Sequence, residues 1–361
     1  MSERAPVAPA AAGRSGMGTD PAAWDRFVAE APNGAYTQLS AWSEVKRANG
    51  WQAWYPLEHG PGGPIGAQVL VRRLGPLPWL VAYAPRGPVA SSFRRDAVGA
   101  WTNRLRRDAR ANPQGGISHV TIDPEVEEGH PLAGWLQEAG WRRAPAIQPD
   151  RTRLVDLTLP EPALWSGLRS KWRQYVQKAR RDGAMVTEVG EEGIEDFYRI
   201  YVETARRARF VYRAESAYRD VYRAYAAKGA VRLLFARLGD GSPVATVMLL
   251  SCGRRVTEPY GGMTDRGGES RANYLLKWEA IRSSREAGFA VYDMWGMAHA
   301  GIDQFKAGFG GREVRYVGAW ELVLNAPVRR ALAAAQHARV SLARRRLGLT
   351  GGGASPGGEG G

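Results

Sequence analysis

The order of the predicted elements in the C-terminal half constrains the fold of this chain more than any other feature. Three apolar strands follow one another by short turns, at 231–238, 244–251 and 255–260. The turn GDGSP at 239–243, between the first two strands, is typical of a hairpin. A glycine-rich loop comes next, followed by a helix at 271–287, a strand at 289–294, a short helix near 302–306 and a strand at 313–324. This order predicts an antiparallel meander that continues into a mixed α+β arrangement.

The same order is similar to that of the acyl-CoA N-acetyltransferase (GNAT) fold, whose sheet opens where a helix follows a glycine-rich loop. The pyrophosphate signature of that fold, Gln/Arg-x-x-Gly-x-Gly/Ala, matches once, at 285–290. There it ends a helix, whereas phosphate is bound by backbone N–H groups at the start of one. We therefore expect Gly288 to cap the C-terminus of that helix. The loop at 261–270 lacks the signature, so coenzyme A binding loses its best support.

Composition divides the chain into segments. We expect a disordered N-terminus, two folded domains, a basic terminal helix and a flexible glycine-rich tail, at 1–20, 21–155, 156–326, 327–347 and 348–361. A proline-rich stretch near 145–162 marks the seam between the two domains. Further helices are expected at 39–49, 95–110, 164–182, 194–208 and 216–228, and further strands at 67–73 and 117–122.

The charge of the chain is strongly positive. Its 361 residues include 50 Lys+Arg against 36 Asp+Glu, a formal net charge of +14. Such a charge favours a polyanionic partner, either nucleic acid or an anionic membrane face. Lysines are rare beside arginines, which makes each lysine more informative, because the two cations are not interchangeable at a site. They stand at positions 46, 171, 178, 228, 277 and 306.

Several classes of protein are excluded by what the sequence lacks. No run approaches the roughly 18 apolar residues of a membrane-spanning helix. The N-terminus has no apolar core of signal-peptide length, and Cys252 is the one cysteine, so we expect a cytoplasmic protein without disulfides. The five histidines have no metal-ligand spacing, so we expect no metal.

Two residues in the N-terminal half are candidates for a site. Lys46 lies on the apolar face of the helix at 39–49, so its ammonium either enters a polar pocket or reaches the solvent at the rim. Asp123 ends the strand at 117–122, before Pro124. It is either a turn residue or a carboxylate that projects into a cleft.

Three features of the C-terminal half are further candidates. Arg213 follows an aromatic run and suits a phosphate clamp, although a salt bridge to Glu215 is the alternative. Lys306 lies just beyond the strand YDMWG and before a glycine-rich run, where a cation can stabilise an oxyanion or a phosphate. The basic face of the helix at 164–182 is either a solvated surface or a track for a phosphate backbone.

Several stretches together resemble the FemABX-type aminoacyltransferases of peptidoglycan cross-bridge synthesis. They run in order from about residue 36 to 325: SAWSEVKRANGW, APRGPV, TIDPEV, IQPDRTRLVDL, KWRQYVQKARRDG, FYRIYVETARRARFVYR, ANYLLKWEAIR and YDMWG…FKAGFGG…YVGAWELVL. The resemblance implies two GNAT-like domains that face a shared cleft, each a mixed, mainly antiparallel sheet flanked by helices. Some family members carry a coiled-coil arm, but no sustained heptad occurs here.

The resemblance also implies an activity. Family members move an amino acid from its charged tRNA to the stem-peptide amine of a UDP- or lipid-linked muramyl-peptide precursor. We therefore expect transfer of glycine, alanine or serine, with aminoacyl-tRNA as co-substrate and no other cofactor. A peripheral contact with the inner membrane face is compatible with such an acceptor.

The family's pattern further assigns roles to individual residues. Those implied in precursor binding are Lys46, Arg213 and Tyr260. Those implied in catalysis are Asp123 near the acceptor amine, and Phe305 and Lys306 near the ester. The tyrosine of AESAYRD, Tyr218, is spaced differently from the family's pattern, and no role is assigned to it.

Two other functions stay open at this point. An acyl-CoA-dependent N-acyltransferase for a small-molecule amine would bind coenzyme A saturably and would not depend on tRNA. A non-enzymatic nucleic-acid-binding protein would bind RNA in a salt-dependent way, even with Lys306 replaced by alanine.

Overall fold

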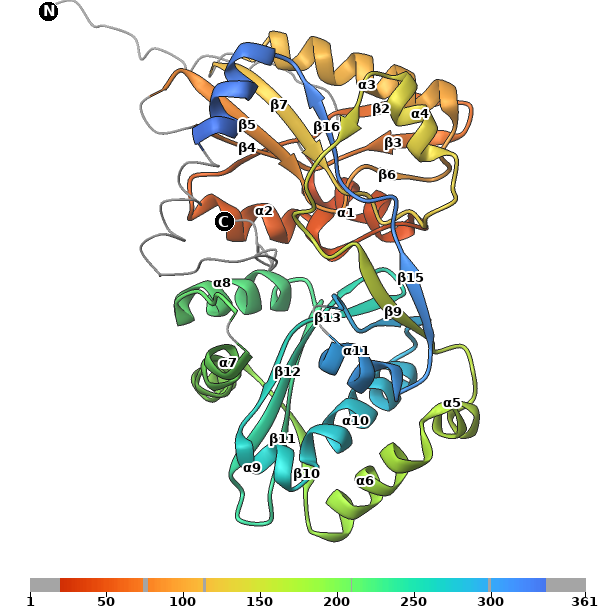
Figure 1. Ribbon diagram of the computed structural model, residues 1–361, viewed down its shortest axis with the longest axis vertical. Coiled ribbons are helices and arrows are strands. Elements are labelled where there is room, and N and C mark those ends of the chain that lie inside the picture. Colours follow the sequence, from red (N-terminus) through yellow and green to blue (C-terminus); the bar gives the residue numbers. More distant parts are fainter. Residues whose placement is uncertain (1–19, 74–76, 113–114, 209, 298–299, 336–361) are drawn as a thin grey trace, which may run out of the picture.

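The computed structural model describes residues 20–73, 77–112, 115–208, 210–297 and 300–335, and these build two large sheets, one above the other along the molecule (Figure 1). The upper sheet has the strand order β1 (Gln52–Trp54), β4 (Val69–Arg73), β5 (Trp79–Ala84), β7 (Gly116–Ile122), β16 (Trp320–Val323) and β8 (Arg142–Arg143). The lower sheet has the order β10 (Met185–Val189), β11 (Val231–Arg237), β12 (Pro243–Cys252), β13 (Arg255–Met263), β14 (Val291–Asp293), β9 (Arg151–Asp156) and β15 (Arg312–Arg315).

The two sheets repeat one pairing pattern. In the upper sheet β1, β4 and β5 pair antiparallel, β5 and β7 pair parallel, and β7 and β16 pair antiparallel. In the lower sheet β11, β12 and β13 pair antiparallel, β13 and β14 pair parallel, and β14 and β9 pair antiparallel. The parallel pair needs a crossover, which α3 (Arg95–Arg110) and α10 (Ala272–Glu286) supply. The predicted α+β class with two GNAT-like sheets is confirmed.

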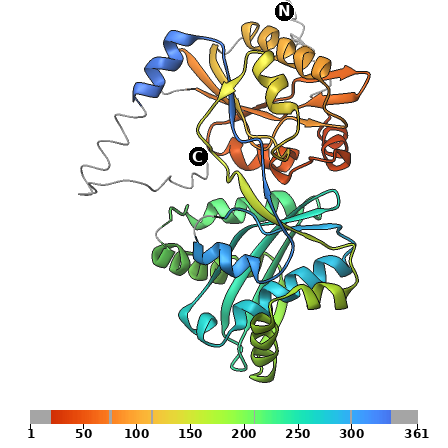
Figure 2. The ribbon, with the colours of Figure 1, turned by 45° about the vertical axis from the view of Figure 1, so that its right-hand side comes forward.

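Helices cover both large sheets. Around the upper sheet lie α1 (Pro21–Glu30), α2 (Ser40–Arg47), α3 and α4 (Leu132–Glu138), with a small sheet of β2 (Leu57–Gly60), β3 (Gly63–Gly66) and β6 (Val89–Ala90). Around the lower sheet lie α5 (Glu161–Gly167), α6 (Ser170–Arg181), α7 (Ile194–Ala208), α8 (Glu215–Ala226), α9 (Asp265–Glu269), α10 and α11 (Ala300–Ala307). Figure 2 shows α7 and α8 on one face of the lower sheet, and α6 and α10 on the other.

A shared core joins the upper and lower parts. Helix α2 packs against α8, and the buried side chains between them form one continuous apolar cluster. Its aromatic members come from both parts of the chain, such as Tyr36 and Trp42 above and Tyr218 and Tyr225 below. The hydroxyl of Tyr225 donates to the carbonyl of Tyr36 at 2.6 Å, which fixes α8 beneath α2.

Most predicted elements of the C-terminal half are confirmed. The turn at 239–243 joins β11 and β12 as a hairpin. Gly288 follows α10 with φ +87, the left-handed conformation of a helix C-cap, so this match to the pyrophosphate signature is a cap. In the upper sheet, however, the chain also forms β5, which the sequence analysis did not predict.

Two predicted elements are wrong in extent. The helix at 164–182 is two helices, α5 and α6, because Leu168 and Arg169 are extended and the Arg169 N–H donates to the carbonyl of Gly308 at 2.9 Å. The strand at 313–324 is β15 and β16, which belong to different sheets. Gly318, at φ +75, lies between them, where the chain crosses from one sheet to the other.

The predicted segment boundaries do not all coincide with the ends of helices and strands. The boundary at 155/156 passes through β9, which pairs with β14 and β15 in the lower sheet. The terminal helix predicted at 327–347 is helical at 326–335, and its remainder lies outside the described residues, as do 1–19 and 348–361. Among the residues described, none of the helices combines the length and apolarity that crossing a membrane requires.

Candidate active site

Lys306 lies on α11, the helix that follows β14 in the chain. Its Nζ donates to the carbonyl oxygen of Trp295 at 2.9 Å and also to that of Gly296. These two acceptors use two of the three N–H bonds of an ammonium. The carbonyls fix the cation at the place where β13 and β14 separate.

The surroundings of Lys306 change its acidity. Burial disfavours the charged ammonium and, with the nearby Lys277, lowers the pKa of Lys306 to about 8. The carboxylates of Glu258, Asp293 and Asp303 act in the opposite direction. The pKa of Lys306 is therefore lower than that of an ordinary surface lysine.

Trp295 connects Lys306 to the upper part of the molecule. Its φ of +56 is uncommon for a residue with a side chain, and its N–H donates to Asp293 at 2.8 Å. The guanidinium of Arg86 lies 4.6 Å from the centroid of the Trp295 ring, and the Tyr36 ring lies 5.5 Å away. The backbone that holds Lys306 is thus itself held by side chains of the upper sheet's unit.

Asp123 is buried and accepts hydrogen bonds on both oxygens. Tyr83 donates its hydroxyl at 2.7 Å, and the backbone N–H of Arg86 donates at 2.6 Å. Burial raises the pKa of Asp123, against the opposing effect of the Arg86 guanidinium. Because Arg86 has φ +61, the carboxylate also stabilises a left-handed turn.

Lys46 enters a pocket and does not reach the solvent at the rim. The residue is 3% exposed, and its Nζ lies 4.6 Å from the centroid of the Trp42 ring. Other residues lining this pocket are Trp51, Leu70, Tyr83, Pro85 and Gln148. Within the described part of the chain, the buried Trp42 Nε1 has no hydrogen-bond partner, so the pocket offers a donor next to a cation.

Arg213 and Tyr260 are brought together by Tyr218, to which the sequence analysis gave no role. The backbone N–H of Arg213 donates to the Tyr218 hydroxyl at 3.2 Å. The Tyr218 ring lies edge-on to that of Tyr260, with centroids 5.4 Å apart, and Tyr201 packs against both. Tyr218 is therefore part of this group, although its spacing in the sequence differs from the family's pattern.

The ring of Tyr36 connects the Lys46 pocket with the backbone that binds Lys306. Tyr36 contacts Trp42 at 5.8 Å and Trp295 at 5.5 Å between centroids, so it lies between the Lys46 pocket and the Lys306 backbone. Tyr83 lines the Lys46 pocket and binds Asp123. Ring contacts through Trp42, Tyr36 and Trp295 therefore connect Lys46 to Lys306, and Tyr83 connects Asp123 to the Lys46 pocket.

Phe305 helps to position α11 through its packing contacts. Its ring lies against Tyr274 and Phe309, with centroid distances of 5.1 and 5.2 Å. Its carbonyl accepts the indole N–H of Trp172 at 3.0 Å. These contacts attach α11 to α6 and α10, so the side chain of Phe305 fixes the helix that carries Lys306.

Two buried ionic groups were not predicted from the sequence. In the first, Arg86 and Arg255 pair with opposite oxygens of Glu125 at 3.1 and 2.5 Å, and Arg255 also pairs with Asp293. This ion-pair network joins the upper and lower sheets. The available signal was a charged residue within an otherwise apolar strand, as in the VYD of β14.

The second group lies where β13 leaves β14. Lys277 of α10 and the hydroxyl of Tyr292 both bind the carboxylate of Glu258. Glu258 stands one residue beyond the last paired position of β13, Thr257. Lys277 and Glu258 both act electrostatically on Lys306.

The basic face predicted on the helix at 164–182 is partly used within the protein. Arg173 donates to the carbonyl of Ser166 at 2.9 Å, and Lys178 pairs with Asp182 at 2.5 Å. Arg180 pairs with Glu279. These pairs reduce the charge that α6 can offer to a phosphate backbone.

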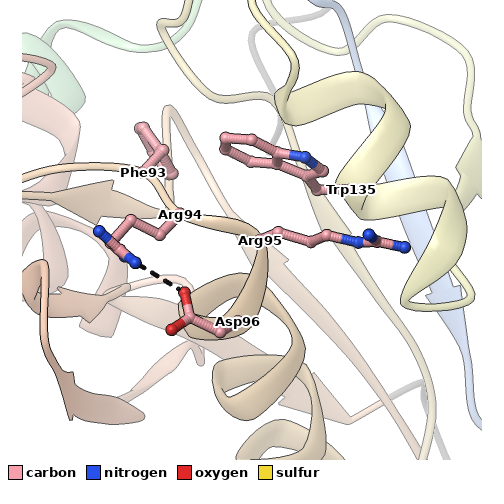
Figure 3. Close-up of a pocket in the computed structure, with 5 residues that line it drawn as sticks. All are labelled: Phe93, Arg94, Arg95, Asp96 and Trp135. Atoms are coloured by element: carbon pink, nitrogen blue, oxygen red, sulfur yellow. Dashed lines mark hydrogen bonds and ion pairs between the residues drawn. The ribbon is translucent and has the colours of Figure 1, made fainter.

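An open pocket elsewhere contains none of the predicted site residues. It lies at the start of α3, where Phe93 and Trp135 face each other above Arg94, Arg95 and Asp96 (Figure 3). Arg94 pairs with Asp96 at 3.4 Å. In the described ranges no three His, Cys, Asp or Glu side chains gather in a way that could hold a metal ion.

Substitution of Gly308 tests whether close packing against Trp172 positions α11. A Cβ at this residue would stand 2.2 Å from the Nε1 of Trp172, so Gly308→Ala must displace the indole or the helix. We expect a loss of about 1–3 kcal/mol in stability and a clear loss of Lys306-dependent activity. Thermal melting and activity assays check this. Gly167→Ala is the matched control, because its Cβ would meet nothing within 4 Å. Equal melting of the two variants would contradict the tight contact.

Comparisons with known proteins agree with the fold. A family model described as an acetyltransferase (GNAT) domain matches residues 166–307. The lipid II:glycine glycyltransferase of Staphylococcus aureus strain MRSA252 is 27% identical over 233 residues, which are 62% of this chain and 55% of the relative. The protein of the same name from strain USA300 is 26% identical over the same length. This chain thus spans about half the length of these curated relatives.

Solved structures share the fold. A crystal structure of FemX has a TM-score of 0.80 at 20% identity and covers 87% of this chain and 98% of its own. The structure of L-PGS from Bacillus licheniformis has a TM-score of 0.53 at 12% identity, with 91% and 99% covered. At these identities the likeness concerns the fold.

Proposed function

We propose that this chain is a FemABX-type aminoacyltransferase that extends the stem peptide of a peptidoglycan precursor. The observation that carries the proposal is the Lys306 ammonium, held by two backbone carbonyls at the opening of the lower sheet. The names of the S. aureus relatives support a lipid II-type acceptor and a glycyl-type transfer. Aminoacyl-tRNA is the proposed donor, and the net charge of +14 favours such a polyanion. The proposed location is the cytoplasm, at the membrane surface.

Lys46 and Trp42 are proposed to contact the diphosphate of the acceptor. A diphosphate needs cations and N–H donors, and the pocket provides the Lys46 ammonium and the free Trp42 Nε1 within the described chain. Arg213 and Tyr260 lie in the adjoining tyrosine group and are proposed to bind the same acceptor. Asp123 acts through Tyr83, which it holds at the wall of this pocket.

The proposed reaction requires no covalent enzyme intermediate. The neutral stem-peptide amine attacks the carbonyl carbon of the aminoacyl ester, a C–N bond forms, and the C–O bond to the tRNA ribose breaks. The proton of the amine ends on the departing ribose hydroxyl. Negative charge collects on the carbonyl oxygen and then on the leaving oxygen, where the remaining N–H of Lys306 can stabilise it. Because an ester is already activated, positioning and one cation supply the catalysis.

The test is transfer from charged tRNA. Radiolabelled glycine, alanine and serine, each on tRNA, are offered with a UDP-linked muramyl pentapeptide and with its lipid-linked form, with and without RNase. RNase-sensitive label in the precursor supports the proposal and identifies donor and acceptor together. No label with any pair, together with saturable coenzyme A binding, would instead indicate an acyl-CoA-dependent N-acyltransferase.

Lys46→Ala is expected to raise the KM for the precursor by about tenfold or more and to leave kcat nearly unchanged. The reason is that the variant removes a charged contact to the acceptor and leaves Lys306 in place. Steady-state kinetics with varied precursor check this. The control is Lys178→Ala, an exposed lysine paired with Asp182 on α6. A loss of kcat with unchanged KM would show that Lys46 does not bind the acceptor.

A further inference from the structure

An apolar tip stands out on the surface between α7 and α8. Val211 is 79% exposed and Phe210 is 36% exposed, and they are adjacent in the chain. Exposed apolar side chains are common singly, but two neighbours at the tip of one connection form a protruding patch. We call Phe210 and Val211 the α7–α8 tip.

The α7–α8 tip is held in a defined position. The Phe210 N–H donates to the carbonyl of Ala205 at 3.1 Å, which continues from the end of α7. The Phe210 ring packs on Tyr201 with centroids 5.5 Å apart, and the Arg213 N–H is bound to Tyr218. The tip is therefore fastened on both sides, and its apolar surface faces outward although a tyrosine cluster lies directly beneath it.

Cations flank the tip, and the proposed acceptor site adjoins it. Arg206 and Arg207 precede it at the end of α7 and are exposed, with Arg207 paired to Asp265 at 2.8 Å. Arg213 follows it and belongs to the group that contains Tyr218 and Tyr260. An apolar tip between arginines is the pattern of a segment that enters the interfacial layer of an anionic membrane.

The size of the patch also points to a bilayer. A stable protein interface buries about 800 Å² on each partner, far more than two side chains provide. Shallow insertion of a few apolar side chains, together with arginine contacts to lipid phosphates, gives weak and reversible binding. That strength suits an enzyme that must leave after each transfer.

We propose that the α7–α8 tip, with its flanking arginines, docks the protein on an anionic lipid bilayer and presents the adjoining Tyr218–Tyr260 group to a membrane-held acceptor. This inference rests on the proposed function, because it concerns the lipid-linked form of the acceptor. The docking itself needs no donor and no transfer, so it can be measured separately.

The first test is binding of the full chain to vesicles in the absence of substrates. Wild-type protein is expected to sediment with vesicles of mixed phosphatidylglycerol and phosphatidylcholine, and much less with pure phosphatidylcholine. Val211→Asp is expected to lower the partition constant on the mixed vesicles by about tenfold, because it replaces an inserting side chain with an anion. The matched control is Met185→Asp on β10, since Met185 is 62% exposed and lies outside the patch. Equal losses in both variants, or no wild-type binding, would overturn the proposal.

The second test separates docking from catalysis. Val211→Asp is expected to transfer to a UDP-linked acceptor in solution at the wild-type rate and to a vesicle-embedded acceptor at a rate at least about fivefold lower. Equal loss on both acceptors would overturn the proposal and place the tip in the acceptor site. A loss of affinity for tRNA with unchanged vesicle binding would also overturn it and identify an RNA contact. If no transfer occurs with any acceptor, the proposed function fails, while the vesicle result still decides whether the tip docks.

Discussion

Replacing Lys306 with alanine is expected to lower kcat for aminoacyl transfer by about 100- to 1000-fold, the usual effect of removing one oxyanion donor. Binding of the acceptor should change little, because Lys46 and Arg213 remain. The variant also removes the hydrogen bonds to the carbonyls of Trp295 and Gly296, so its melting temperature must be measured beside its kinetics. Gln304→Ala is the matched control, since Gln304 is an exposed residue on the same helix. Wild-type kinetics in the Lys306 variant would remove Lys306 from the active site.

The pH dependence offers an independent measurement on the same residue. Burial lowers the pKa of Lys306 to about 8, so the ammonium is present below that pH and is lost as the pH rises through it. The cation stabilises the oxyanion only in its charged form. We therefore expect transfer to fall on the alkaline side, centred near pH 8, and the residual activity of Lys306→Ala to lack this fall. An identical alkaline fall in the variant would assign it to another group, such as the substrate.

Glu125→Gln is expected to destabilise the protein by about 3–5 kcal/mol, the range seen when one partner of a buried ion pair is removed. Glu125 binds both Arg86 and Arg255, and its side chain is as buried as that of Arg86. Its loss leaves Arg86 without a paired carboxylate beneath the Trp295 ring, while Arg255 keeps Asp293. The midpoint of thermal unfolding should fall by about 6 °C or more.

The control for this variant is an ion pair at the surface. Glu138 pairs with Arg95 at 2.7 Å, but both side chains are more than half exposed, and such pairs contribute little. Glu138→Gln should melt close to the wild type. If Glu125→Gln melts there too, the ion-pair network does not hold the two sheets together, and the shared apolar core alone must do so.

The sequence predicts those parts of the fold that depend on local pattern. The strands β11 to β13 and the helix α10 were placed within a few residues because alternation, a GDGSP turn and a capping Gly288 are all local signals. Local pattern does not predict that β9 pairs with β14 in the lower sheet or that β16 pairs with β7 in the upper sheet. The choice of a strand's partner depends on residues far away in the chain. The break between α5 and α6 depends on the contact of Arg169 with Gly308, which is equally non-local.

The residues of the candidate site also differ in whether a local sequence signal marks them. Lys46 and Lys306 stand out in the sequence as candidates because a rare lysine on an apolar face or beside a glycine-rich run is unusual in itself. Glu125, Arg255 and Glu258 look like ordinary charged residues in the sequence, and only the ion pairs that they form in the folded chain distinguish them. The spacing of Tyr218 gives no signal in the sequence, whereas in the structure its hydroxyl accepts a hydrogen bond from the backbone N–H of Arg213.

The crossing of β16 has a consequence for any attempt to separate the two halves of this protein. β16 arrives from the end of the chain and pairs with β7 and β8 of the upper sheet, next to the parallel pair of β5 and β7. A fragment that ends near residue 150 would expose the edge of β7 to other chains, and an open edge invites aggregation. The upper unit would be expected to become soluble on its own only if β16 were joined to it through a new linker, as in a circular permutant. We therefore expect that neither half folds as a simple truncated fragment, because each truncation between the sheets removes a strand partner.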